Sequence, residues 1–354
     1  MKILDRYLGQ AIIHYTFLVL LVLISLHTFI SFVTELDDVG HGSYEISHAI
    51  KYILYSIPQN IYDLLPVAVL LGSVLGLGNM ASQSELIAMR AAGFSIERII
   101  QSALSTGMIF VVMTALIGEI IAPPAERAAD KLRSLTKVSV SSEQSREGFW
   151  TRTGDTFNRI GQVLASGEYR DIEIFEFDPQ HKLRNITQAV RATYHNDGWH
   201  LKEVTQRRIF PKRVIINHVP EAIWKSRLNP EILQVVMVDP HEFSVWGLHH
   251  YIKYLRENKQ ATERHQQAFW SKIIAPFNAL IMMFLAIPFV FGPLRSVSMG
   301  QRVLVGALVG IGFFLFNRLF NQAGLVFGFP LFLSAAFPSF LSLGIGMIMM
   351  RRVY

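Results

Sequence analysis

The chain has 354 residues, of which 51% are hydrophobic and 17% are charged, and it contains no cysteine. The segment 123–270 holds 22 Lys and Arg and 18 Asp and Glu, whereas the other 206 residues hold only 11 and 9. A soluble domain carries about a quarter charged residues, so this distribution excludes a soluble enzyme and indicates a polar insert within an apolar chain. The net charge of +6 is spread thinly, which argues against a nucleic-acid partner. The lack of cysteine excludes disulfides and thiolate metal ligands.

Six apolar segments are predicted to cross a membrane, because a bilayer core about 30 Å thick needs roughly 20 residues of helix. The first, 7–34, follows Lys2 and Arg6 but is longer than the apolar part of a signal peptide, so we expect a retained helix. The other predicted spans are 52–78, 99–118, 273–294, 303–322 and 330–350. We therefore expect three parts: spans one to three in 1–122, a polar domain with its linker in 123–246, and a connector with spans four to six in 247–354.

Basic residues in the short loops predict the orientation of the spans. An inside N-terminus places one set of basic residues on the cytoplasmic side: Lys2, Arg6, Arg90, Arg98, Arg295, Arg302, Arg351 and Arg352. The short loop 34–50 contains four acidic residues and no Lys or Arg. Both termini are therefore predicted to be cytoplasmic, with the polar insert in the periplasm of a Gram-negative inner membrane.

The polar insert has the period-2 pattern of β-strands. Segments 148–157 and 171–178 alternate in this way, and 189–194 and 199–204 flank the hairpin signal Asn196-Asp197-Gly198. Short strands with frequent turns predict a jelly-roll-like or sandwich domain, whose inward positions include Ile174 and Leu201. Open sheet edges accept a strand from another chain. A solvated cap without a partner is the alternative.

After the insert, Leu248, Ile252 and Leu255 recur at helical spacing within 247–256. This pattern predicts an amphipathic connector lying at the outer membrane surface.

The sequence lacks the motifs of nucleotide hydrolysis and of metal binding. The sequence contains no Gly-x-x-x-x-Gly-Lys-Ser/Thr, so we do not expect this chain to hydrolyse ATP itself. The 12 histidines show no metal-ligand spacing, and no cofactor is expected. Three Gly-x-x-x-Gly pairs predict close helix packing, namely Gly72 and Gly76, Gly306 and Gly310, and Gly324 and Gly328.

Ionisable residues within the spans are candidates for ligand contact, because charge at membrane depth is costly. Asp63 lies between Pro58 and Pro66 near mid-membrane, where a broken backbone ladder is tolerated beside a cavity. Glu119 and Arg318 lie near the outer ends of their spans, and a structural ion pair, snorkelling to the membrane interface or lipid contact explains them. Candidate partners for phosphates at headgroup level are Lys51, Lys272 and Arg318.

Between the second and third spans, segment 82–93 predicts a short helix. Ser82 and Ser84 are its N-cap candidates and Gly93 its end. Leu86, Met89 and Arg90 share one face. The helix is either a surface helix at the membrane or a coupling helix that docks into a cytoplasmic motor.

The chain resembles the lipopolysaccharide export permease family, LptF/LptG. The resemblance covers essentially the full length and is carried by Leu4-Asp5-Arg6-Tyr7, Ser84–Gly93, Gly118-Glu-Ile-Ile-Ala-Pro123, and Phe291-Gly-Pro-Leu-Arg-Ser296 with Met299-Gly300. The last loop is more similar to the G-type than to the F-type members.

This resemblance implies a polytopic α-helical membrane protein with six transmembrane helices and an inserted all-β periplasmic domain. It also implies an F-type permease partner, a cytoplasmic ATPase dimer, a membrane-anchored periplasmic bridge protein, and lipopolysaccharide as the transported lipid. Glu85 matches the coupling-helix glutamate, which is expected to meet a basic residue of the ATPase. Where close relatives place lysines at and after the outer end of the first span, this chain has Ser31, Asp37 and Asp38.

Two other functions are kept as alternatives. One is an ion-coupled secondary transporter that uses Asp63. The other is a membrane-tethered periplasmic lipid-binding protein, for which six spans are more than an anchor needs.

Overall fold

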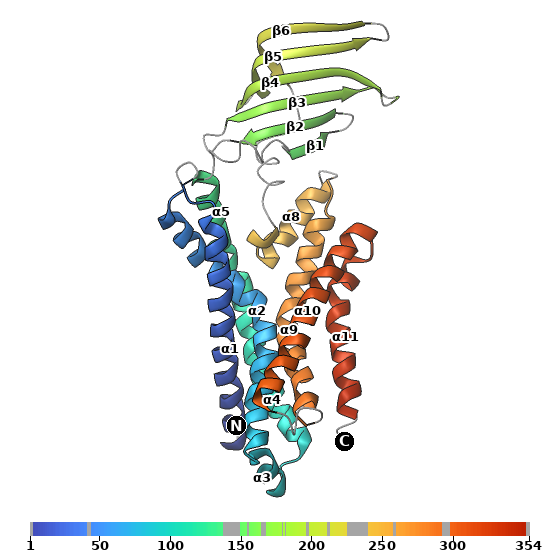
Figure 1. Ribbon diagram of the computed structural model, residues 1–354. Helices are drawn as coiled ribbons and strands as arrows, with labels where there is room; N and C mark the ends of the chain where they lie inside the picture. Colours follow the sequence, from blue (N-terminus) through green and yellow to red (C-terminus); the bar gives the residue numbers. More distant parts are fainter. Residues whose placement is uncertain are drawn as a thin grey trace. The chain divides into compact units, whose positions relative to one another are not determined.

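The computed structural model describes the chain with gaps, and the chain divides into two compact units (Figure 1). The helical unit comprises Met1–Val39, Ile46–Lys131 and Asp239–Tyr354, and the second unit comprises Gly40–Glu45 and Leu132–Val238. The described residues are 3–40, 44–136, 149–153, 156–163, 168–178, 180, 182–195, 198–210, 213–224, 240–257, 260–291 and 298–351.

Within this described part, six helices are long and apolar enough to cross a membrane. They are α1 (Ile3–Leu36), α2 (Ile46–Ser82), α4 (Ile96–Leu116) with its continuation through η1 (Ile117–Ile121) and α5 (Ala122–Thr136), α9 (Glu263–Phe291), α10 (Met299–Phe327) and α11 (Leu331–Arg351). The six predicted spans are thus confirmed. Most of the helices extend beyond the predicted bounds, because hydropathy marks the apolar stretch of a helix and not its polar ends.

Shorter helices connect the long ones. α3 (Glu85–Ala91) lies between α2 and α4, and the turn η3 (Pro240–Glu242) precedes α8 (Val245–Glu257). Within the helical unit, the start of α1, the whole of α3 and the end of α11 lie at one end of the bundle, which we call the α3 end, and α8 lies toward the opposite end (Figure 1).

The centre of the helical unit is α2, in which every residue from Leu65 to Gly78 is buried. Glycines allow neighbouring helices to approach it closely. A Cβ on Gly72 would collide with the backbone of Thr16 in α1, and a Cβ on Gly310 would lie 2.7 Å from Val67. Gly76 and Gly306 make similar approaches to α1 and α2.

The third predicted glycine pair behaves differently. Gly324 packs against Ser334 of α11. Gly328 instead adopts a φ of 68° at the C-cap of α10 and has open space around it, so the prediction that it packs against another helix was wrong. Glycine is favoured there because a left-handed residue ends the helix.

The second unit contains one antiparallel sheet with its strands in sequential order. The strands are β1 (Phe149–Thr153), β2 (Thr156–Val163), β3 (Tyr169–Phe177), β4 (Leu183–His195), β5 (Gly198–Phe210) and β6 (Arg213–Trp224). The predicted β4–β5 hairpin is confirmed, since His195 pairs with Gly198. The described strands form a meander, so the all-β prediction holds and the jelly-roll connectivity is not confirmed in this part of the chain.

Candidate functional sites

The short helix α3 is positioned by two apolar side chains. Leu86 and Met89 are only 3% and 7% exposed, because they pack into the core formed by the chain's own helices. Their predicted role in contacting a motor is therefore corrected to a role in packing. Ile87, which is 49% exposed, and the exposed Arg90 are available instead. Periodicity identified one face of this helix without showing that the face turns inward.

Of the two N-cap candidates for α3, Ser84 is confirmed and Ser82 is not, and the predicted end at Gly93 is confirmed as well. Ser82 is the last residue of α2 and donates to the carbonyl of Asn79 at 2.8 Å. Ser84 occupies the N-cap position with a φ of 62° and makes no side-chain capping bond. At the other end, Gly93 has a φ of 88° and donates to the carbonyl of Arg90 at 3.0 Å.

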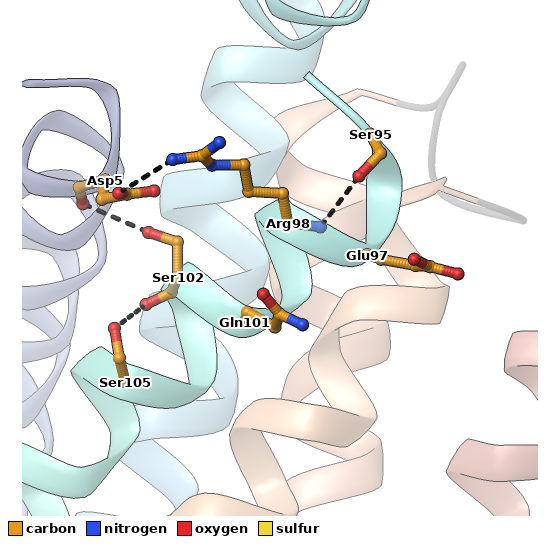
Figure 2. Close-up of a pocket in the computed structure, with 7 residues that line it drawn as sticks. All are labelled: Asp5, Ser95, Glu97, Arg98, Gln101, Ser102 and Ser105. Carbon is orange, nitrogen blue, oxygen red and sulfur yellow. Dashed lines mark hydrogen bonds and ion pairs between the residues drawn. The ribbon is translucent and has the colours of Figure 1, made fainter. Parts of the chain in front are cut away.

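The first turns of α1 contact both the first residue of α3 and the first turns of α4. The Tyr7 hydroxyl donates to the Glu85 carboxylate, lying 3.2 and 3.1 Å from its two oxygens. The Asp5 carboxylate lies 3.9 Å from the Arg98 guanidinium, and the Asp5 carbonyl accepts from Ser102 at 3.2 Å. Figure 2 shows Asp5 facing these two residues of α4. They line a polar pocket of about 430 Å³.

A second, larger cavity of about 600 Å³ lies within the helical unit. It gathers three of the predicted membrane-depth residues, namely Asp63 of α2, Lys272 of α9 and Arg318 of α10. Arg264 of α9, which sequence reasoning missed, also lines it. Three basic residues and one acidic residue therefore give the cavity a net positive charge at neutral pH.

The charged groups of this cavity differ in how they are bound. Lys272 is 7% exposed and its ammonium donates to the carbonyl of Phe243. Asp63 accepts from the Gln59 amide at 3.1 Å. Arg318 is exposed and makes no hydrogen bond or ion pair with another described residue. Of the predicted cations, Arg318 is thus the one whose fork of donors can serve a ligand.

The walls of the cavity also carry neutral polar groups that the sequence analysis passed over. The Asn321 amide oxygen accepts from Ser271 at 2.9 Å and from Gln267, and its nitrogen donates to the carbonyl of Asn317 at 2.7 Å. The two α9 residues are four apart, as are the two α10 residues. The i,i+4 spacing of polar residues was the signal that could have found them, within the predicted span for the α10 pair and just before it for the α9 pair.

Glu119 is not paired with Arg318, so the ion pair that the sequence left open between them is wrong. Its carboxylate accepts from the backbone amides of Val245 at 2.7 Å and Trp246 at 3.3 Å. Glu119 lies in the π-helical η1, and it supplies a negative charge to the N-terminus of α8. It therefore connects the third span to the connector helix.

The predicted amphipathic connector is confirmed as α8, whose Leu248, Ile252 and Leu255 are buried. Tyr251 is buried on the same face and stacks on Phe243 at 5.1 Å. Burial, with the nearby Tyr254, raises the pKa of Tyr251 to about 12.

The remaining predicted residues lie elsewhere. Lys51 is exposed on α2 and does not line the larger cavity. Ile174 and Leu201 are 1% and 2% exposed in the apolar layer of the sheet, so their inward direction is confirmed.

The loop 292–297 lies outside the described residues. In the part of the chain that the structure describes, no three His, Asp or Glu side chains form a group that could hold a metal ion.

These features define a polytopic α-helical membrane protein with an inserted all-β domain and a polar cavity among its spans. The chain belongs to the family described as lipopolysaccharide export system permease LptF/LptG, whose sequence profile matches residues 6–352. It is 36% identical over 340 residues to the lipopolysaccharide export system permease protein LptG of Escherichia coli K12, covering 95% of this chain and 94% of that protein. It is 37% identical over 341 residues to LptG of Haemophilus influenzae, covering 96% and 95%.

Proposed function

We propose that this chain is a G-type permease subunit that takes lipopolysaccharide from the inner membrane and passes it toward the outer membrane. The observation that carries the proposal is the net positive cavity with Arg264, Lys272 and Arg318 on its walls, in a chain of this permease family. Lipopolysaccharide combines acyl chains with phosphates. Apolar spans around a cationic, hydrogen-bonding cavity suit such an amphipathic anion.

The energy is proposed to come from a separate cytoplasmic ATPase dimer, since the sequence lacks a P-loop. The exposed side of α3, with Ile87 and Arg90, is its proposed docking surface, and Glu85 is proposed to meet a basic residue there. This arrangement requires both termini and the α3 end to face the cytoplasm. An F-type permease would complete the translocation path.

The β domain is proposed to lie in the periplasm and to hand lipid to a membrane-anchored bridge protein. The proposed parts of the chain are 1–122, 123–246 and 247–354, and Ile174 and Leu201 lie on the proposed lipid path within the sheet's apolar layer.

The test is reconstitution of the tagged chain with its co-purified partners. We expect an ATPase and a second permease to co-purify, and ATP to drive release of lipopolysaccharide from proteoliposomes to a soluble acceptor. Release driven by a proton gradient without ATP would instead favour secondary transport through Asp63. Lipid binding by the β domain without any release would favour a tethered binding protein.

A further inference from the structure

The phenol of Tyr7 holds the Glu85 carboxylate in a defined way. Its single hydroxyl lies at nearly equal distances, 3.2 and 3.1 Å, from both carboxylate oxygens, so it lies between them. A carboxylate offers about four acceptor positions. A donor placed between the oxygens leaves their outer lone pairs open to a second donor from outside the chain.

The residues next to Glu85 in the sequence do not by themselves hold its carboxylate in one position. The helix α3 has seven residues, far fewer than the roughly 12 that an isolated helix needs in water. Ser84 makes no capping bond to it. Leu86 and Met89 hold the inner face, and the direction of the Glu85 side chain is then set by its bond to Tyr7.

The same turn of α1 also contacts α4. Asp5 lies 3.9 Å from Arg98 and accepts from Ser102 through its carbonyl at 3.2 Å (Figure 2). An exposed ion pair at this distance contributes little stability alone. Its importance here is geometric, because residues two apart on α1 contact the helices that precede and follow the turn at Gly93.

We infer that Tyr7 is a positioning residue for Glu85 and that it joins α3 to the first span, so that movement of α3 is transmitted to α1. This inference rests on the proposed function, in which an ATPase acts on α3. The hydroxyl orients the Glu85 carboxylate for the ATPase's basic group while remaining bound to it.

The experiment compares Tyr7→Phe, Glu85→Ala and the double variant in the reconstituted complex with its ATPase. Tyr7→Phe keeps the ring and removes only the hydroxyl. We expect roughly tenfold slower ATP-driven lipopolysaccharide release, equivalent to ~1.4 kcal/mol, with an unchanged KM for ATP. Because Tyr7 acts through Glu85, adding Tyr7→Phe to Glu85→Ala is expected to cause no further loss. The inference would be overturned if the double variant released lipid more slowly than Glu85→Ala alone. It would also be overturned if Tyr7→Phe released lipid at the wild-type rate.

Tyr15→Phe is the matched control, because Tyr15 lies on α1 beside the same groove as Tyr7 and Glu85 and has no bond to Glu85. It is expected to release lipid at the wild-type rate. Amide hydrogen exchange in the chain alone supplies a test that needs no ATPase: α3 should exchange faster in Tyr7→Phe than in Tyr15→Phe. Equal exchange would overturn the contact, whereas failure of release in the wild-type complex would count against the proposed function instead.

Discussion

Arg318 combines an exposed guanidinium with a place on the wall of the cationic cavity. Its planar fork can bind a phosphate through two hydrogen bonds, which an ammonium cannot match in geometry. The neighbouring Lys272 already donates to a backbone carbonyl. At the scale of single residues, and under the proposed function, we therefore expect Arg318 rather than Lys272 to bind a lipid phosphate.

We predict that Arg318→Gln weakens binding of lipopolysaccharide by roughly tenfold, as expected for loss of a charge-assisted hydrogen bond. Binding to the purified complex would be measured by displacement of a fluorescent lipopolysaccharide. Assembly and basal ATPase activity should be unchanged. Lys51→Gln is the control, because Lys51 is exposed and lies off the cavity. Equal losses in the two variants would show a nonspecific effect of charge.

A second prediction at this scale concerns the approach of α1 to α2. A Cβ at Gly72 would collide with the backbone of Thr16, so Gly72→Ala should destabilise the folded chain by about 1–3 kcal/mol through overpacking. Gly344→Ala, in α11, meets nothing within 4 Å and should leave stability unchanged. Thermal unfolding of both variants in detergent measures the difference, and equal unfolding temperatures would contradict the packing argument.

Among the elements, α8 depends on a group from outside its own sequence. Its first two amides are bound by Glu119 at 2.7 and 3.3 Å, and four buried side chains hold its inner face. The carboxylate satisfies donors that a helix N-terminus leaves unpaired. The span that carries Glu119 is thereby tied to the connector that leads into α9.

Glu119→Gln is predicted to weaken this cap by about 1 kcal/mol, since it removes a negative charge from a helix N-terminus. Hydrogen exchange at the amides of Val245 and Trp246 should quicken about fivefold, which is that free energy expressed as a population of open states. Glu257→Gln removes a carboxylate from the last residue of the same helix and should not quicken exchange. If both variants exchange alike, Glu119 does not cap α8.

These elements also show which features of the structure could be predicted from the sequence. Long apolar runs predicted the six spans, and alternation predicted the hairpin, because each signal is local. The partner of Glu119 was not local: two charges near the outer ends of their spans suggested a pair, whereas the backbone of α8, 126 residues away, provides the donors.

The same limit applies to the functional residues. Helical periodicity placed Leu86 and Met89 on one face of α3, but which face turns inward depends on how the other helices of the chain pack against it. Two of the cavity's three cations, Lys272 and Arg318, were predicted because charge at or within a span is conspicuous, whereas Arg264 was missed because it lies before the predicted span 273–294. Its amide groups on α9 and α10 were missed because neutral polar residues in membrane helices are common.

At the α3 end of the helical unit, α1 and α10 make polar contacts with the three consecutive helices α2, α3 and α4. Tyr7 and Asp5 of α1 bind Glu85 and Arg98, and Arg302 of α10, which is 3% exposed, donates to the carbonyl of Gly78 in α2. Helix α1 is therefore attached to α3 itself, and α10 is attached to the last two turns of α2, which lead into α3. Under the proposed function, a movement of α3 reaches both helices at once.

The buried guanidinium of Arg302 gives the corresponding test. Arg302→Met keeps an apolar stem and removes the donor to Gly78, so α10 should no longer follow the end of α2. In the reconstituted complex we predict continued ATP hydrolysis with at least fivefold less lipopolysaccharide released per ATP, an effect of about 1 kcal/mol on the coupled step. Arg351→Met, exposed at the same end on α11, should release lipid normally. If Arg302→Met instead prevents assembly of the complex, Arg302 serves folding alone. If release per ATP is unchanged, α10 is not driven through this contact.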